Sequence, residues 1–284
     1  MGKVRIVTDS TSDIPAPVRA QLGIEMVPLK VLFGEETYLD SITISTEQFY
    51  ERLQASPVLP TTSQPSPLEF AEVYERLLDE DPDSPIISIH LASVLSGTHQ
   101  SAVIAESMLE RPADISIVDS KSASYGIGLM VVRAAEMAQA GKSKEQILNE
   151  IQRIQNDMEL YFLVDTLEYL HKGGRIGRAS ALIGSILNIK PILSLDKDGG
   201  VYSVDKVRGT KKAMGRIAEM LKTSFGDAPV GLIVAGSDNR EAAEELGDRV
   251  KSELNVKEVS YTTVGSVIGV HTGPGVSAVF LYRM

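Results

Sequence analysis

The chain has 284 residues, of which 43% are hydrophobic and 23% charged, and this composition is typical of a globular protein rather than a disordered one. Its length favours two α/β domains over one small core. A formal charge of −10 argues against binding to nucleic acid or to an anionic membrane, and the absence of cysteine excludes disulfides, thiolate nucleophiles and cysteine metal sites.

Short apolar runs alternate with longer amphipathic ones along the chain, which is typical of strands wrapped by helices in a largely parallel sheet. In the first half, strands are predicted over residues 3–7, 25–33, 85–91 and 114–118. Helices are predicted over residues 15–22, 46–55, 67–78, 98–109 and 127–140. One more helix is expected to begin after Ser143, which has capping-box spacing to Gln146, and to end near residue 158.

The loops between these elements are rich in small hydroxyl side chains. They have the sequences TDSTSD, TTSQPS, ASVLSGTHQS and DSKSAS. In open parallel sheets the carboxyl ends of the strands meet at one edge, where helix N-termini direct free N–H groups into a crevice. Each loop alone is explained by helix capping, but the four together favour a binding site at that edge.

A second series of strands begins at the apolar run LYFLV. Strands are predicted over residues 160–164, 191–195, 201–206, 230–235, 258–263 and 276–282. The turn signal in LSLDKDGGVYSV predicts a hairpin, so the second sheet should be mixed. We therefore predict an αβα three-layer domain with a mainly parallel sheet over residues 1–157, followed by a two-layer α/β domain with a mixed sheet over residues 158–284.

Two of the hydroxyl-rich segments precede helices and could bind an anion. The residues concerned are Thr61, Thr62 and Ser63 in TTSQPS, and Ser96, Gly97 and Thr98 in LSGTHQSA. Glycine at a helix start allows close approach of a ligand to the backbone. Together the two clusters could hold a carboxylate without a cation, although each alone is explained by a helix cap.

Two basic loops offer sites of phosphate size. HKGGRIG contains Arg175, and KVRGTKKA places Arg208, Lys211 and Lys212 at another helix start. Arginine suits forked recognition of carboxylate or phosphate oxygens. Basic residues at a helix start are equally common on solvated surfaces, so the pattern alone leaves both interpretations open.

The segment VIGVHTGPG places His271 in a tight turn. An imidazole with a near-neutral pKa at such a turn could transfer a proton or pair with an anion. The other histidines, His90, His99 and His171, form no metal-ligand spacing with it, so no metal site is predicted.

Several enzyme signatures are absent. The AGKS segment resembles a phosphate loop, but Glu136 stands where the upstream glycine belongs, and neither GxGxxG nor GxSxG occurs. Asp9 follows the first strand as an aspartyl phosphoryl acceptor would, yet its loop lacks the second, closely spaced acidic residue. Asp9 or His271 acting in a self-contained phosphoryl- or acyl-transfer enzyme remains an alternative.

Seven segments in order resemble those of the DegV family: VTDSTSD, TTSQPS, LSGTHQSA, VDSKSAS, LHKGGRIG, KVRGTKKA and GVHTGPG. The resemblance covers essentially the whole chain. It implies that a long-chain fatty acid such as palmitate lies in a buried tunnel with its carboxylate between the two domains. It also implies that the chain needs no cofactor, is not catalytic alone, and presents the carboxylate to a separate ATP-dependent kinase subunit in lipid transport or fatty acid metabolism.

The resemblance carries roles onto individual residues. Thr62 and Ser96 are the implied carboxylate contacts, whereas Arg208 and His271 are implied near the phosphoryl group, with Arg175 as a further candidate. A purely regulatory lipid-binding protein would carry the same residues, so this alternative stays open.

The beginning of the chain has no apolar run of the signal-peptide kind, and no stretch of about 18 apolar residues occurs. We therefore expect a cytoplasmic protein without stable membrane insertion. Such a protein must shield a bound lipid from water itself.

Overall fold

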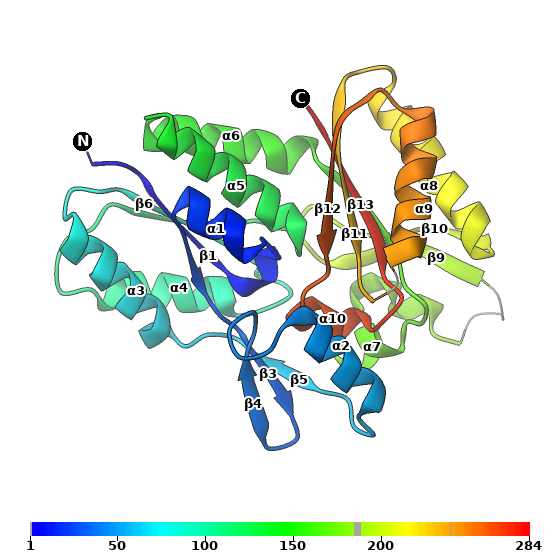
Figure 1. The fold of residues 1–284 in the computed structure, drawn as a ribbon, viewed down its shortest axis with the longest axis horizontal. Helices are drawn as coiled ribbons and strands as arrows, with labels where there is room; N and C mark the ends of the chain where they lie inside the picture. The colour runs from blue at the N-terminus through cyan, green and yellow to red at the C-terminus, as the bar shows by residue number, and fades with distance from the viewer. Residues whose placement is uncertain (1, 185–188, 239) are drawn as a thin grey trace.

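The computed structural model describes residues 2–184, 189–238 and 240–284, and two α/β halves lie side by side in it (Figure 1). The N-terminal half is built on the parallel strands β1 (Arg5–Asp9), β2 (Ile24–Val27), β6 (Ile86–His90) and β7 (Ile115–Asp119). Their order in the sheet is β2-β1-β6-β7. The chain therefore leaves β1 to one side and returns on the other, which makes a crevice at the carboxyl ends of β1 and β6.

Helices cover both faces of this sheet, as a three-layer αβα arrangement requires. One face is covered by α1 (Ala16–Leu22), α5 (Tyr125–Gln139) and α6 (Lys144–Asp157), and the other by α3 (Pro67–Glu80) and α4 (Thr98–Met108). Alternation along β1 sends Ile6 to the core beneath α5 and Val7 to the core beneath α3. The predicted capping box between Ser143 and Gln146 at the start of α6 is confirmed.

The C-terminal half contains a mixed sheet in the order β10-β9-β8-β13-β11-β12. Its strands are β8 (Glu159–Leu163), β9 (Ile189–Leu195), β10 (Val201–Arg208), β11 (Val230–Gly236), β12 (Val256–Thr263) and β13 (Ser277–Arg283). Among the described residues of this sheet, only β11 and β12 pair in parallel, and β9 and β10 form the predicted hairpin. The predicted α/β fold class is confirmed.

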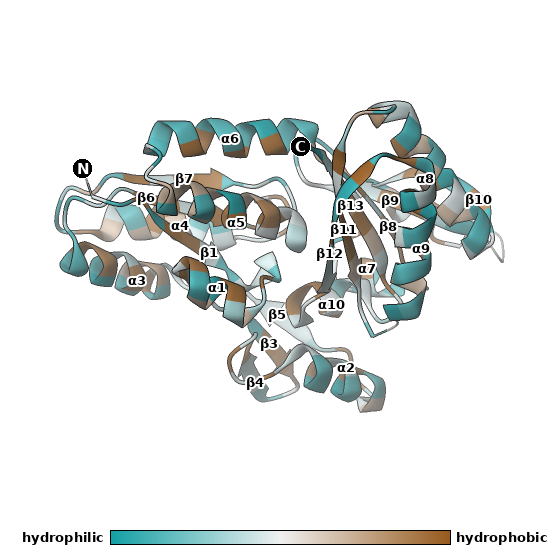
Figure 2. Ribbon diagram, turned by 45° about the horizontal axis from the view of Figure 1, so that its top comes forward, coloured by the Kyte–Doolittle hydropathy of each residue, from teal (hydrophilic) through white to brown (hydrophobic). Residues whose placement is uncertain are grey.

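One face of the mixed sheet is covered by α8 (Thr210–Phe225) and α9 (Arg240–Glu253). The opposite face turns toward the N-terminal half, so Phe162 and Phe280 share an apolar cluster with Leu129 of α5. Figure 2 shows hydrophobic residues on the helix faces that meet the sheets and hydrophilic residues on the outer faces. The inner face of the mixed sheet thus forms a second apolar surface between the halves.

The predicted single strand over residues 25–33 is wrong. The structure divides it into β2 and β3 (Lys30–Phe33), and β3 belongs to a third sheet with β4 (Glu36–Leu39) and β5 (Thr61–Ser63). The chain changes sheet at Pro28, which has no N–H for a ladder, and at Leu29, whose N–H donates to Ser10 Oγ at 3.1 Å. Thr61–Ser63, expected in a loop, is therefore a short strand in register with β3.

Short helices connect the third sheet to the C-terminal half. They are α2 (Thr46–Ala55), α7 (Glu168–Lys172) and α10 (Ser266–Thr272). Two 3-10 turns lie elsewhere, after β1 at Ser10–Ser12 and after α7 at Gly177–Leu182. Phe49 of α2 and Val267 of α10 share one apolar cluster, and Tyr50 donates to the carbonyl oxygen of Val264 at 3.1 Å. All strands of the first large sheet precede residue 158, and all strands of the second follow it. Helix α2, which precedes residue 158, nevertheless packs against α10, which follows it. The domain boundary at residue 157 stays a prediction.

Candidate functional site

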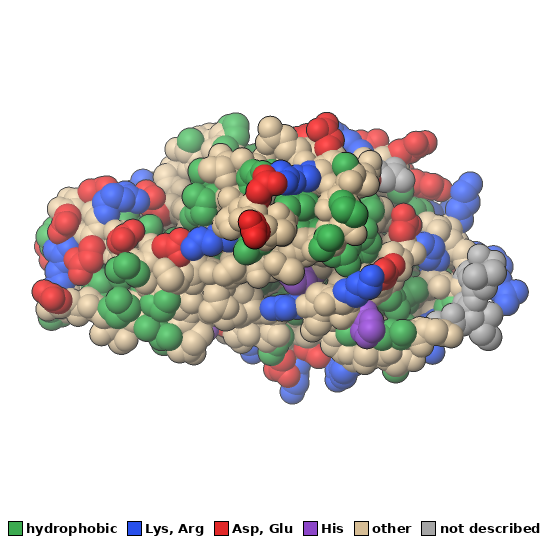
Figure 3. Space-filling model, turned by 90° about the horizontal axis from the view of Figure 1, so that it is seen from below, with side chains coloured by type: hydrophobic (Ala, Val, Ile, Leu, Met, Phe, Trp, Pro, Cys, Tyr) green, Lys and Arg blue, Asp and Glu red, His purple; other side chains and the backbone are tan. Residues whose placement is uncertain are grey.

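A cavity of about 280 Å³ lies between the two halves, where the segments that follow β2, β6 and β7 meet the inner face of the mixed sheet. Most of its wall is apolar and includes Leu91, Phe162, Val276 and Phe280. Polar side chains gather at one end, and they are Thr62, Ser63, Gln64, Ser96, Arg175 and His271. Seen from below, the surface is hollowed between the halves, with a histidine and a basic side chain inside the hollow (Figure 3). The lining of the cavity is therefore amphipathic, with an apolar part and a polar end.

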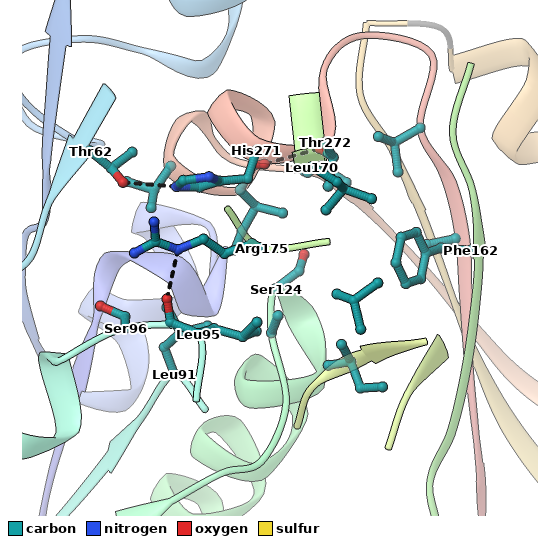
Figure 4. A pocket seen from close by; sticks show the side chains of 18 of the residues that line it. Thr62, Leu91, Leu95, Ser96, Ser124, Phe162, Leu170, Arg175, His271 and Thr272 are labelled. Atoms are coloured by element: carbon teal, nitrogen blue, oxygen red, sulfur yellow. Dashed lines mark hydrogen bonds between the residues drawn. The ribbon is translucent and has the colours of Figure 1, made fainter. Parts of the chain in front are cut away.

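Thr62 and His271 form a direct contact in the polar end. Strand alternation in β5 leaves Thr61 and Ser63 exposed and turns Thr62 inward, half-buried. His271 comes from the last turn of α10, and its Nε2 lies 2.9 Å from Thr62 Oγ1 (Figure 4). The predicted residues Thr62 and His271, 209 positions apart, are thus brought together by the third sheet and α10.

His271 is a neutral hydrogen-bonding group rather than a cation. Burial, and secondly the charge of Arg175, lower its pKa to about 4. Its buried Nδ1 has no hydrogen-bond partner among the described residues. In the tautomer whose Nε2–H donates to Thr62 Oγ1, the Thr62 O–H is left to donate into the cavity. This arrangement suits binding of an anion through hydroxyl groups.

The second predicted cluster meets the first. Ser96 Oγ lies 2.9 Å from Thr98 Oγ1 and accepts from the Thr98 N–H at 3.3 Å. A Cβ atom at Gly97 would lie only 2.3 Å from the side-chain oxygen of Gln64, so glycine leaves room for the Gln64 side chain in its present position. Gln64 donates to Ser101 Oγ at 3.3 Å and lines the cavity, a residue that the sequence analysis did not single out.

Three of the predicted carboxylate residues are not part of the cavity wall. Thr61, Gly97 and Thr98 do not line it, whereas Thr62, Ser63 and Ser96 do. Thr98 is fully buried, and its hydroxyl is engaged with Ser96. We infer that Thr98 positions the Ser96 hydroxyl and does not contact a ligand.

The two predicted arginines have different positions. Arg175 lines the cavity, and it donates from Nε to the carbonyl oxygen of Leu95 at 3.0 Å and from Nη1 to that of Gly173 at 2.8 Å. Its guanidinium lies between Thr62 and Ser96 in Figure 4. Arg208 is the exposed last residue of β10 and does not line the cavity. The structure therefore brings Arg175, not Arg208, to the hydroxyl groups.

Asp9 lies in a buried network of hydrogen bonds and not in the cavity. It is fully buried, and its Oδ2 accepts from the Leu91 N–H at 3.1 Å and lies 3.0 Å from His90 Nδ1. Its Oδ1 accepts from the Thr11 N–H at 3.0 Å, and His90 Nε2 lies 2.6 Å from Ser88 Oγ. Both carboxyl oxygens of Asp9 have hydrogen-bonding partners, and Asp9 does not line the cavity. This geometry argues against Asp9 as a phosphoryl acceptor.

The carboxyl group of the half-buried Asp13 connects the cavity wall to α10. Ser124 lines the cavity with φ 54° and ψ −143°, an unfavourable region for a residue with a Cβ, and donates to Asp13 Oδ2 at 2.5 Å. The N–H of Gly265, the N-cap of α10, donates to the same carboxyl group. Burial raises the pKa of Asp13 to about 8. Asp13 thus links the start of α5 to the helix that carries His271.

No group of three or more His, Cys, Asp or Glu side chains that could hold a metal ion occurs among the described residues. The prediction of no metal remains untested by this observation.

None of the helices within the described ranges is both long and apolar enough to cross a membrane.

Known proteins resemble this chain along its full length. A family model described as "Uncharacterised protein, DegV family" matches residues 3–284. A DegV domain-containing protein from Caldanaerobacter subterraneus is 40% identical over 283 residues, which are 99% of each chain. A solved structure of a DegV family protein from Thermus thermophilus is described as showing fatty acid binding. It is 37% identical to this chain, with a TM-score of 0.92 and 100% of both chains covered. DegV from Bacillus subtilis, described as a fatty acid binding protein, has 35% identity and a TM-score of 0.87, again over 100% of both chains.

Proposed function

The chain belongs to the DegV family, and on that premise we propose that it binds a long-chain fatty acid such as palmitate in the cavity between its halves. The observation that carries this proposal is the amphipathic cavity, apolar around Phe162 and polar around Thr62 and Ser96. Burial of roughly 14 methylenes at about 0.8 kcal/mol each supplies on the order of 11 kcal/mol before the costs of association. The acyl chain therefore provides most of the affinity.

The polar end has the chemistry to receive the carboxylate. A buried carboxylate is expensive to desolvate, and hydroxyl donors offset that cost. The Thr62 hydroxyl can donate to the carboxylate when its oxygen accepts from His271, and the Ser96 hydroxyl can donate from the opposite loop when its oxygen accepts from Thr98. Arg175 adds a positive charge at the exposed rim.

We propose further that the bound carboxylate is presented to a separate ATP-dependent kinase subunit in the cytoplasm, which forms an acyl phosphate for lipid transport or fatty acid metabolism. The chain then contributes binding and positioning, without catalysis of its own. Support comes from the polar end of the cavity, where the exposed Arg175 stands beside the hydroxyl groups. Full burial of Asp9 disfavours the self-contained enzyme.

Native mass spectrometry of the purified protein, followed by organic extraction, tests the proposed function. We expect one C16 to C18 acid per chain, and uptake of palmitate after delipidation. Protein that carries no lipid and takes up no palmitate would overturn the proposal and leave a polar ligand or a self-contained enzyme.

The positions of the two arginines predict different effects on palmitate binding. Arg175→Ala is expected to weaken binding about threefold to fivefold, because an exposed ion pair contributes up to about 1 kcal/mol. The effect should shrink at high salt. Arg208→Ala is the matched control and should leave the affinity unchanged, as measured by displacement of a fluorescent fatty acid. The opposite ranking would place the basic contact in the 206–213 loop.

A further inference from the structure

Two leucines are shared between the apolar cavity and a second cavity. Leu160 and Leu195 line the cavity of about 280 Å³ and also a cleft of about 690 Å³. The cleft is otherwise polar along much of its wall, which includes Ser120, Lys121, Gln152, Gln155, Asn156 and Lys197. The two leucines therefore separate the apolar cavity from the polar cleft, and we call this pair the partition.

The strand register places these leucines opposite each other. Phe162 of β8 pairs with Leu193 of the antiparallel strand β9. Leu160 lies two residues before Phe162 and Leu195 two residues after Leu193, so the antiparallel pairing brings the two leucines to the same side of the sheet. Ser194 Oγ donates to the carbonyl oxygen of Leu160 at 2.6 Å and fixes this register. Because β8 begins at Glu159 and β9 ends at Leu195, the pair is the last row of the cavity wall.

The backbone around the partition is held in place. The turn between β9 and β10 packs against the N-terminal half, where a Cβ atom at Gly199 would lie 2.5 Å from the Cβ of Ala92. Gly199 has φ +90°, a conformation that glycine adopts readily. The leucine side chains, which are only partly buried, are thus what closes the cavity toward the cleft.

The chemistry changes abruptly beyond the leucines. In the cleft, Gln155 donates to the carbonyl oxygen of Asp119 at 2.8 Å, and Gln152 donates to Asn156 Oδ1 at 3.3 Å. The hydroxyl groups of Thr62 and Ser96 belong only to the other cavity. If the carboxylate of an acyl chain lies there, its tail extends into the apolar part of the cavity, which Leu160 and Leu195 line.

We propose that Leu160 and Leu195 form the wall at the tail end of the cavity and set the longest acyl chain that the protein accepts. This inference rests on the proposed function and assigns its specificity for chain length. Without the two side chains, the end of a longer chain emerges into the polar cleft. The partition then also predicts that a polar group at the methyl end is rejected, since it would be buried without partners.

The test compares acids of different length on the delipidated full chain. Affinities are measured for saturated acids from C14 to C22 and for an 18-carbon α,ω-dicarboxylic acid. For the wild type we expect an upper length limit and rejection of the diacid. Leu160→Ala/Leu195→Ala should raise the affinity for C22 and for the diacid at least tenfold relative to palmitate. Each methylene that gains room is worth up to about fourfold in affinity.

Two further variants separate this role from general weakening. Leu170→Ala is the matched control, because Leu170 lines the apolar cavity but not the cleft; it should weaken all acids alike. Leu195→Phe should lower the length limit by filling the end of the cavity. If the double variant and Leu195→Phe bind palmitate but keep the wild-type length profile, the partition is refuted while the proposed function stands. If the wild type binds no fatty acid of any length, both fail.

Discussion

Replacing Thr62 and Ser96 together by alanine is expected to weaken palmitate binding by 100-fold or more. A hydrogen bond to a charged group has a net contribution of about 1.5 to 3 kcal/mol. The double variant removes two hydroxyl donors from a partly buried carboxylate. A combined loss of about 3 kcal/mol corresponds to more than 100-fold in the dissociation constant. Isothermal titration of delipidated protein with palmitate measures the effect.

The ligand itself supplies the sharpest control for this variant. Hexadecanol has the same tail without the charge, so its affinity should fall far less in Thr62→Ala/Ser96→Ala than that of palmitate. Thr61→Ala, on the exposed side of the same strand, should change neither affinity. An equal loss for acid and alcohol would mean that the two side chains act through packing and that the carboxylate binds elsewhere.

The part of this site that follows a parallel strand could be predicted from the sequence. Ser96 lies in the loop after β6, and the rule that ligands bind at the carboxyl ends of parallel strands is sufficient to place it at the crevice. The α/β class follows equally from the alternation of apolar runs, since that pattern depends only on local periodicity.

The position of Thr62 arises differently. Three polar residues, TTS, carry no alternation of hydrophobicity, so β5 is invisible to a periodicity argument and exists because it pairs with β3. From the sequence alone, Thr62 is one member of a hydroxyl cluster, and only the family resemblance selects it as a carboxylate contact, which stays a prediction. Its inward orientation depends on a third sheet that was missed when the chain was assumed to run straight through Pro28.

The choice between the arginines could not be made from spacing either. Arg175 and Arg208 both lie in basic loops with glycine neighbours, and both suit an anion. The two arginines differ in one contact between loops 80 residues apart: Arg175 donates a hydrogen bond to the carbonyl oxygen of Leu95. Such non-local packing is decided by the arrangement of the two halves.

Asp13 depends even more on distant segments. In the sequence it is one acidic residue in TDSTSD, a loop that reads as exposed and polar. In the structure it is covered by segments around Ser124 and Gly265, more than 100 residues further along the chain. Their packing removes water from the carboxyl group, and desolvation then dominates its protonation.

This burial makes Asp13 a source of pH-dependent stability. Its pKa is raised from 3.8 to about 8, so the native state holds a proton that the unfolded state releases at a lower pH. The free energy of unfolding must therefore fall as the pH rises between about 4 and 8. Asp40, raised by burial to a pKa of about 6, has the same sign, and His271, lowered to about 4, has the opposite sign. The contributions of Asp40 and His271 are the same in the wild type and in an Asp13 variant, so the difference between the two proteins from pH 6.5 to 8 reports Asp13.

Asp13→Asn is therefore expected to be more stable than the wild type at pH 8 and nearly equal to it at pH 4. Between pH 6.5 and 8 the wild type should lose about 1.5 kcal/mol more unfolding free energy than the variant, because the slope of about 1.4 kcal/mol per pH unit falls to half that value at the pKa of about 8. The asparagine carbonyl oxygen can still accept from Ser124 or Gly265, and it cannot ionise. Urea denaturation at four pH values measures the slope, with the exposed Asp83→Asn as control. Parallel slopes for Asp13→Asn and the wild type would show that Asp13 is ionised in the native state, and its link between α5 and α10 would then be a charged one.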